Sequence, residues 1–172
     1  DVLATLVAKR VGTGRERPVH VVASNNPAAL SRLYYAPRTL RQTRLEARRG
    51  LVALMRSAAR AAPRVHGPVL CLYGDQDQLV PPQAMAQAWG ELPPPVRLDL
   101  ITGGHHLLLR DRRGALALGD IASWINQPER FLPSGGDITA AVWLAQEQGA
   151  SGLGGRSPAW FLPARLDGVV PP

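Results

Sequence analysis

Two short segments of the sequence combine acidic residues and histidines at the ends of apolar runs. Asp75 and Asp77 follow the largely apolar run at residues 69–74. His105 and His106 follow a second such run, at residues 96–101. A carboxylate beside an imidazole fixes the ring tautomer and stabilises the imidazolium that forms when the histidine removes a proton from a nucleophile. Polar turns of this kind are also common in purely structural loops, so spacing alone leaves both interpretations open. The segments are candidates for the acid and the base of a catalytic triad.

The stretches around these turns have the pattern of an α/β fold. Residues 69–73 form an unbroken apolar run, which is typical of a strand buried on both faces in a parallel sheet. Residues 96–101 predict a second strand, and residues 82–90 and 115–125 predict a helix after each strand. The last of these helices places Leu118, Ile121, Ala122 and Ile125 on one face. Because parallel strands present their carboxyl ends at one edge of a sheet, both turns should lie at that edge.

The region before the first strand is helical and rich in arginine. Asn26-Pro27 predicts the start of a short helix with Asn26 as its N-cap. From Thr39 to about Ala62, apolar residues recur at helical spacing, which predicts one amphipathic basic helix or two helices broken near Gly50. Residues 1–66 carry thirteen basic and three acidic residues, giving +10, whereas residues 67–172 carry seven and ten, giving −3. The positive charge therefore belongs to the helical region.

Length and cysteine content limit the class of protein. At 172 residues and 45% hydrophobic content, the chain is long enough for one ordinary domain but not for two. No apolar run approaches the roughly 20 residues of a membrane-spanning helix. Cys71 is the single cysteine, so no internal disulfide can form and thiolate metal binding is not expected.

The two polar turns also match the motifs of a known hydrolase family. A strand followed by Gly-x-x-Asp-x-x-(Val/Ile)-Pro is matched by residues 74–81, and a His followed by an apolar triplet and Arg-Asp is matched by residues 106–111. Residues 68–125 thus resemble the C-terminal part of the α/β-hydrolase fold, in particular its monoacylglycerol lipase and lysophospholipase branch, also labelled serine aminopeptidase-like. The resemblance implies that Asp77 is the triad acid and His106 the triad base. The motif registers favour them over the neighbouring Asp75 and His105, which remain alternatives.

The resemblance covers about residues 24–126 and implies a division of the chain. Residues 1–62 are expected to form a helical cap or lid region over the acyl site, and residues 63–127 the β-α-β-α core of the hydrolase. Residues 128–172 are expected to be an extension with a mobile tail, because Gly and Pro are frequent near the end. The resemblance implies no cofactor and no metal.

The sequence departs from this family in its nucleophile. Family members carry a Gly-x-Ser-x-Gly elbow before the cap, and no such pattern occurs in the chain. The nearest imitation surrounds Ser157, which lacks the second Gly and is followed by Pro158. We therefore expect the C-terminal portion of a longer serine hydrolase, which supplies the triad acid and base but not the serine.

The expected substrate is a lipid-like carboxylic ester, of the lysophospholipase or monoacylglycerol lipase type. The basic helix suggests peripheral contact with an anionic membrane, so a cytoplasmic or membrane-peripheral location is expected. The alternative is a non-catalytic remnant whose arginine-rich helix binds a partner, a membrane surface or nucleic acid. Nucleic acid is the least favoured of these partners, since the chain has no recognised nucleic-acid motif and few aromatic residues near its arginines. The oligomeric state is left open.

Overall fold

A computed structural model describes residues 21–38 and 45–151 of the chain. The predictions for the first 20 residues, for residues 39–44 and for the tail, including Ser157, lie outside the described residues. The elements follow in the order α2 (Pro27–Tyr35), α3 (Leu45–Ala61), η1 (Ala62–Arg64), β1 (Val69–Gly74), α4 (Pro82–Glu91), β2 (Val96–Ile101), η2 (Leu108–Arg110), α5 (Gly114–Asn126) and α6 (Gly136–Ser151).

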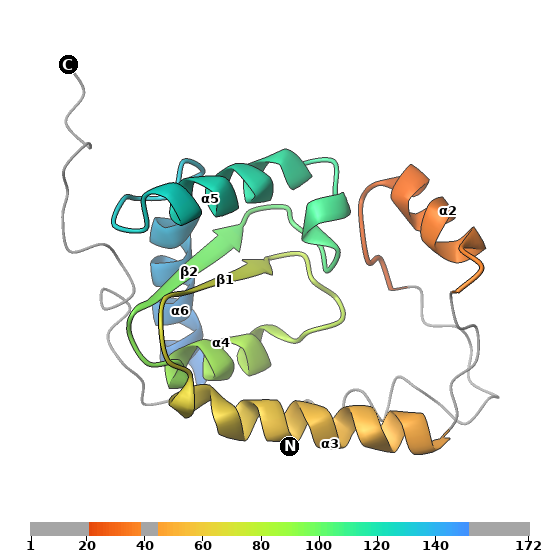
Figure 1. Cartoon of the computed structure of the whole chain (residues 1–172), viewed down its shortest axis with the longest axis horizontal. Coiled ribbons are helices and arrows are strands. Elements are labelled where there is room, and N and C mark those ends of the chain that lie inside the picture. Colours follow the sequence, from red (N-terminus) through yellow and green to blue (C-terminus); the bar gives the residue numbers. More distant parts are fainter. Residues whose placement is uncertain (1–20, 39–44, 152–172) are drawn as a thin grey trace.

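The two strands pair in parallel, as the β-α-β-α pattern predicts. Their register aligns Val69 with Val96 and Gly74 with Ile101, so both strands end at the same level. Figure 1 shows α4 and α5 on opposite sides of this small sheet, with α6 beside β2. The α/β class is therefore confirmed, and the carboxyl ends of both strands lie at one edge.

The core lies between the sheet, α4 and α6. Leu98 and Leu100 of β2 are almost fully buried and pack with Trp89 of α4 and Leu144 of α6. Rings of Tyr73, Trp89 and Trp143 stand 5.3 to 6.0 Å apart in edge-on and tilted contacts, an arrangement that aromatic quadrupoles favour. The compact part therefore continues past residue 127, because α6 contributes to the core.

Strand β2 also buries two polar residues, Arg97 and Asp99. Because successive side chains of a strand alternate between its faces, they lie on the opposite face from Leu98 and Leu100. Arg97 donates to the carbonyl oxygens of Pro128 and Arg130 and forms an ion pair of 3.2 Å with Asp137 at the start of α6. Asp99, the next side chain on this face, has no exposed surface. The segment between α5 and α6 is thereby fastened to the strand.

One burial prediction was wrong, and the apolar face of α5 is less buried than that of an amphipathic helix against a sheet would be. Strand β1 is only half-buried over residues 69–72, because β2 is its only partner strand among the described residues. In α5 the predicted apolar face is largely exposed, with Leu118 at 51% and Ile125 at 66%, while Gly114, Ala117 and Asp120 are buried. The buried residues of α5 lie at a spacing of three, and among the described residues no element covers its larger apolar side chains.

The helices before the sheet have the predicted positions. Asn26 caps α2, since its Oδ1 accepts from the Ala29 amide at 3.3 Å. Helix α3 runs without a break through Gly50, so of the two alternatives the continuous helix is observed. Figure 1 shows α3 along the side of the molecule next to α4, and α2 beyond the carboxyl edge of the sheet.

Candidate functional site: an acid turn and a histidine turn

The turn after β1 holds Asp77 in a fixed orientation. Oδ1 of Asp77 accepts hydrogen bonds from the amides of Leu79 at 2.7 Å and Val80 at 3.0 Å. The Tyr73 hydroxyl, from the end of β1, donates to the Val80 carbonyl at 2.8 Å. Burial, with a contribution from the negative charge of Asp77, raises the pKa of Tyr73 to about 12, so this phenol stays a donor at any physiological pH. These bonds commit one oxygen of Asp77 and leave the other for a partner.

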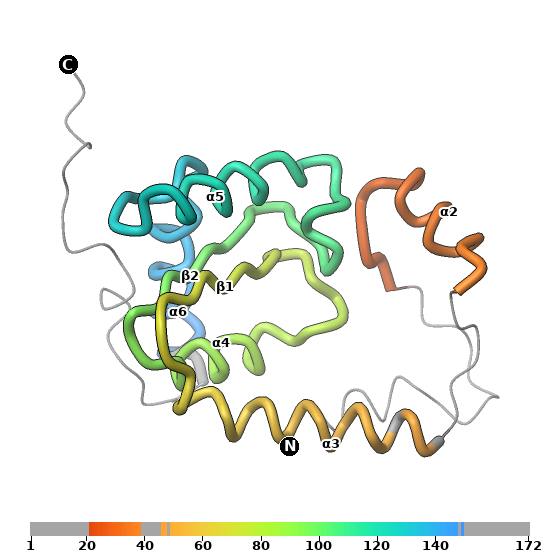
Figure 2. The backbone as a smooth tube through the Cα atoms, in the orientation of Figure 1, coloured from red at the N-terminus to blue at the C-terminus, as the bar shows by residue number. Residues whose placement is uncertain are grey.

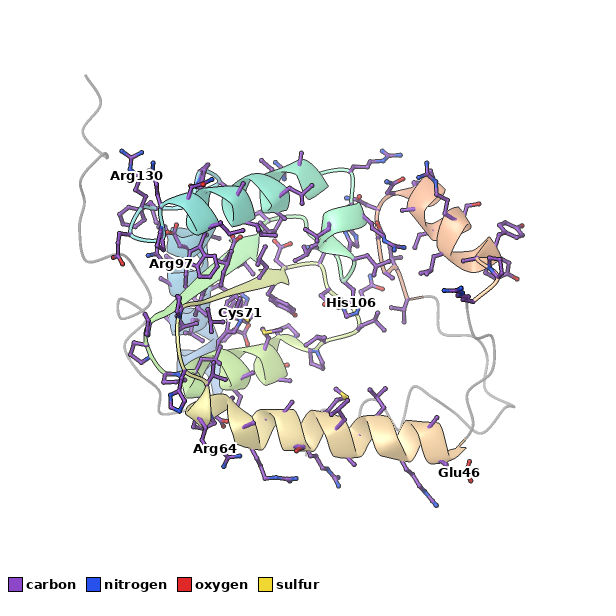
Figure 3. All side chains as sticks on the ribbon, viewed as in Figure 1. Glu46, Arg64, Cys71, Arg97, His106 and Arg130 are labelled. Atoms are coloured by element: carbon purple, nitrogen blue, oxygen red, sulfur yellow. The ribbon has the colours of Figure 1, made fainter. Side chains whose placement is uncertain are left out.

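That partner is His106. Its Nδ1 lies 2.9 Å from Oδ2 of Asp77, and the two side chains are 39% and 5% exposed. Because a carboxylate only accepts, this contact places the proton on Nδ1 and leaves the lone pair on Nε2. Nε2 of His106 has no hydrogen-bond partner among the described residues. Figure 3 shows His106 at the end of the sheet nearest α2.

The acid turn and the histidine turn are also joined through their backbones. Oδ1 of Asp75 accepts from the Gly103 amide at 2.7 Å, and the Gln76 amide donates to the Gly104 carbonyl at 2.9 Å. A Cβ at Gly74 would overlap this same Gly104 carbonyl oxygen, so glycine permits the close approach. Asp75, an alternative acid in the sequence, thus holds the two turns together and does not face an imidazole in the described contacts.

His105, the alternative base, has a different carboxylate. Its Nδ1 lies 3.2 Å from Oδ2 of Asp111, and its amide donates to the same oxygen at 2.6 Å. The other oxygen of Asp111 accepts from the Ser24 hydroxyl at 2.5 Å and from the Asn25 amide at 3.3 Å. Ser24 is 1% exposed and bonds to the carboxylate instead of an imidazole, which is not the order of a nucleophile, base and acid.

Burial opposes the ionisation of Asp111, but the hydrogen bonds from Ser24, His105 and Asn25 outweigh it, so the pKa of this carboxyl lies below its usual value. Asp111 is therefore a carboxylate under ordinary conditions. Sequence reasoning included it in a motif without giving it a role, and missed Ser24 altogether, because its partner stands 87 residues away.

The structure thus brings Asp77 and His106 together and pairs His105 with Asp111. Asp75 accepts a hydrogen bond from the backbone of the histidine turn. Catalysis by Asp77 and His106 stays a prediction. Over the described ranges 21–38 and 45–151, no group of three His, Cys, Asp or Glu side chains could hold a metal ion. No helix in this part of the chain is long and apolar enough to cross a membrane.

Comparisons with known proteins agree with the fold. A family model described as serine aminopeptidase, S33, matches residues 3–113, a range that includes both Asp77 and His106. No curated protein and no solved structure matches the chain. Since the family match covers more than half of the 172 residues, the chain belongs to the serine aminopeptidase S33 family of α/β-hydrolases.

Proposed function

We propose that this chain supplies the acid and the base of a serine ester hydrolase. The observation that carries the proposal is the contact of 2.9 Å between Nδ1 of His106 and Oδ2 of Asp77. With Nδ1 committed to the carboxylate, Nε2 can accept the proton of an attacking hydroxyl, and Asp77 stabilises the imidazolium that results. His106 then returns the proton to the leaving group, and a second cycle with water releases the acyl group.

The nucleophile in this proposal comes from outside the printed sequence. No Gly-x-Ser-x-Gly elbow occurs among the 172 residues, and the Ser24 hydroxyl is occupied by Asp111. The chain alone is therefore expected to be inactive, and activity to require a segment or partner that presents a serine to Nε2 of His106.

A lipid-like ester is the substrate class we favour, of the lysophospholipase or monoacylglycerol lipase type. The side chains of Leu30, Ser31, Leu33, Tyr34 and Tyr35 on α2 border an open, mainly apolar surface depression of about 470 Å³. This helix follows directly on the segment that bonds to the histidine turn. An acyl chain fits such a surface, because burying apolar area contributes about 25 cal/mol per Å².

We further propose peripheral contact with an anionic lipid surface through α3. Arg49, Arg56 and Arg60 fall on one side of this helix, and Leu51 and Leu54 on the other at 51% and 66% exposure. A basic amphipathic helix with exposed leucines is typical of segments that lie at a membrane interface. Such contact would bring the site near its lipid substrates.

The test uses the protein encoded by the natural reading frame that contains this sequence, expressed together with any residues that the frame encodes before Asp1. Hydrolysis of a monoacylglycerol, a medium-chain p-nitrophenyl ester and an aminoacyl arylamide is compared. Ester cleavage is expected, and Asp77→Asn and His106→Gln should each lower kcat on the order of 10³-fold or more. The matched controls are Glu129→Gln and His66→Gln, both exposed.

Three results would separate the alternatives. Preference for the arylamide would refute ester specificity while keeping the acid and base assignment. Full activity in His106→Gln would refute that assignment. A reading frame without a serine elbow, together with no hydrolysis of any substrate, would favour the non-catalytic alternative.

A further inference from the structure

The segment that precedes α2 bonds to both polar turns. We call residues 22–26 the strap. Figure 2 shows it running beside the turn that leads into η2. The Val22 amide donates to Oε1 of Gln78 at 3.0 Å, and Gln78 follows Asp77 directly. The Ala23 carbonyl accepts from the Leu107 amide at 2.9 Å, and Leu107 follows His106 directly.

The strap also holds the other neighbour of His106, through Asp111. Ser24 and Asn25 donate to one oxygen of Asp111, while the His105 amide donates to the other. The backbone amides on both sides of His106 are therefore fixed, one by Asp111 and one by the strap itself. These bonds fix the backbone on both sides of His106, so its Cα–Cβ bond keeps the direction from which Nδ1 reaches Asp77.

Further bonds fasten the strap to the segment after the histidine turn. Oδ1 of Asn25 accepts from the Arg112 amide at 2.9 Å, and Nδ2 of Asn26 donates to the Arg110 carbonyl at 2.9 Å. The amide of Asn26 donates to Oγ of Ser24 at 3.2 Å, so the strap is also braced internally. The Ser24 hydroxyl joins these bonds, because it donates to Asp111 and accepts from Asn26.

We propose that the strap is a positioning device for the acid and base pair, with Ser24 and Asp111 as positioning residues that keep Nδ1 of His106 on Oδ2 of Asp77. This rests on the proposed function, in which that pair does the proton transfer. The strap touches the neighbours of both residues and neither reacting atom. Its loss should leave the fold intact and release the imidazole.

The test is nuclear magnetic resonance on the full chain at pH 8, comparing wild type, Ser24→Ala, the conservative Ser24→Thr and the control Ser57→Ala, an exposed serine of α3. The ¹⁵N shifts of the His106 ring give the fraction of the Nδ1–H tautomer. Ser24→Ala should lower this fraction and speed hydrogen exchange at the His105 and Leu107 amides about tenfold or more, while β2 amides stay protected. Ser24→Thr should restore both readouts, and Ser57→Ala should change neither.

An unchanged tautomer fraction and unchanged exchange at Leu107 in folded Ser24→Ala would overturn the proposal. If Ser24→Ala does not fold, Asn25→Ala decides by the same two readouts, since it removes only the acceptor of the Arg112 amide. The proposed function fails separately: a wild-type His106 without preference for the Nδ1–H tautomer would refute the acid and base pair itself. A wild type with that preference and a variant that keeps it would refute only the strap.

Discussion

Asp99 is the buried group whose replacement should change stability most. Its two carboxyl oxygens and Oδ2 of Asp120 are buried and receive no hydrogen bond from any residue that the structure describes. Asp120 faces it from α5 and Asp137 from α6, while Arg97 on its own strand pairs with Asp137. Burial, followed by the charges of Asp120 and Asp137, raises the pKa of Asp99 from 3.8 to about 7. A proton shared between Asp99 and Asp120 would supply the missing donor.

The sign of the pH dependence follows from this raised pKa. Because the folded state binds the Asp99 proton more tightly than the unfolded state, the contribution of this group to the free energy of unfolding is fully present below about pH 4. The contribution is lost progressively between about pH 4 and pH 7, and the free energy of unfolding does not change further through Asp99 at higher pH. At about 1.4 kcal/mol per pH unit, the loss approaches an upper limit of about 4 kcal/mol at pH 8. Asp99→Asn removes the charge, and its amide can donate to Asp120. We expect it to stabilise the chain by about 2 to 4 kcal/mol at pH 8 and to be close to neutral at pH 4.

Urea unfolding followed by tryptophan fluorescence measures this effect in wild type, Asp99→Asn and the exposed control Glu129→Gln at pH 4 and pH 8. The difference between wild type and Asp99→Asn isolates the Asp99 carboxyl from the other ionisable groups, which all three proteins share. A ¹³C titration of the Asp99 carboxyl gives its pKa directly. The reasoning is refuted if Asp99 titrates near pH 4, or if Asp99→Asn is less stable than wild type at pH 8.

Three other perturbations follow from the geometry. Gly74→Ala should separate the acid turn from the histidine turn, because its Cβ would overlap the Gly104 carbonyl oxygen; a cost of about 2 kcal/mol or more in urea unfolding is expected, against no loss for Gly119→Ala, where nothing lies within 4 Å. Gly136→Ala should also destabilise, because its Cβ would overlap Oδ1 of Asp99, and combining it with Asp99→Ala should recover much of the loss if that overlap is the cause. Binding to anionic vesicles should weaken strongly at about 0.5 M salt, where the Debye length is only a few Å; sedimentation that is insensitive to salt, or equal for neutral vesicles, would contradict an electrostatic contact of α3.

The elements that form the site could be predicted from the sequence because local signals specify them. Strand β2 has the predicted bounds Val96–Ile101, and β1 and α4 differ from prediction by a single residue at one end. Parallel pairing then places Asp77 and His106 at one edge without further information. Burial was harder, since the exposure of β1 and of Leu118 in α5 depends on which elements cover them. The residues of α6 were assigned to an extension outside the core, because the packing of this helix on β2 depends on Ala140 and Leu144, whose partners are distant in sequence.

The role of Ser24 could not be predicted for a related reason. A serine just before a capped helix predicts a hydrogen bond within the local turn. The bond between Ser24 and Asp111 depends instead on the tertiary fold. The motif around His106 included Asp111 by position alone, whereas its contacts with Ser24 and His105 appear only in three dimensions.

The sequence separations of these contacts suggest an order of assembly. The Asp77 and His106 contact closes a loop of 29 residues, whereas the strap reaches Arg110 and Asp111 across 84 to 87 residues. Loop-closure entropy grows with the logarithm of loop length, so the shorter closure costs less and gains support from sheet pairing first. We expect the acid turn and the histidine turn to come together while the strap is still undocked, and pulsed hydrogen exchange during refolding should protect the β2 amides before the Leu107 amide. Docking of the strap is then the last step of folding at this edge of the sheet, and undocking of the strap is the first step of unfolding there.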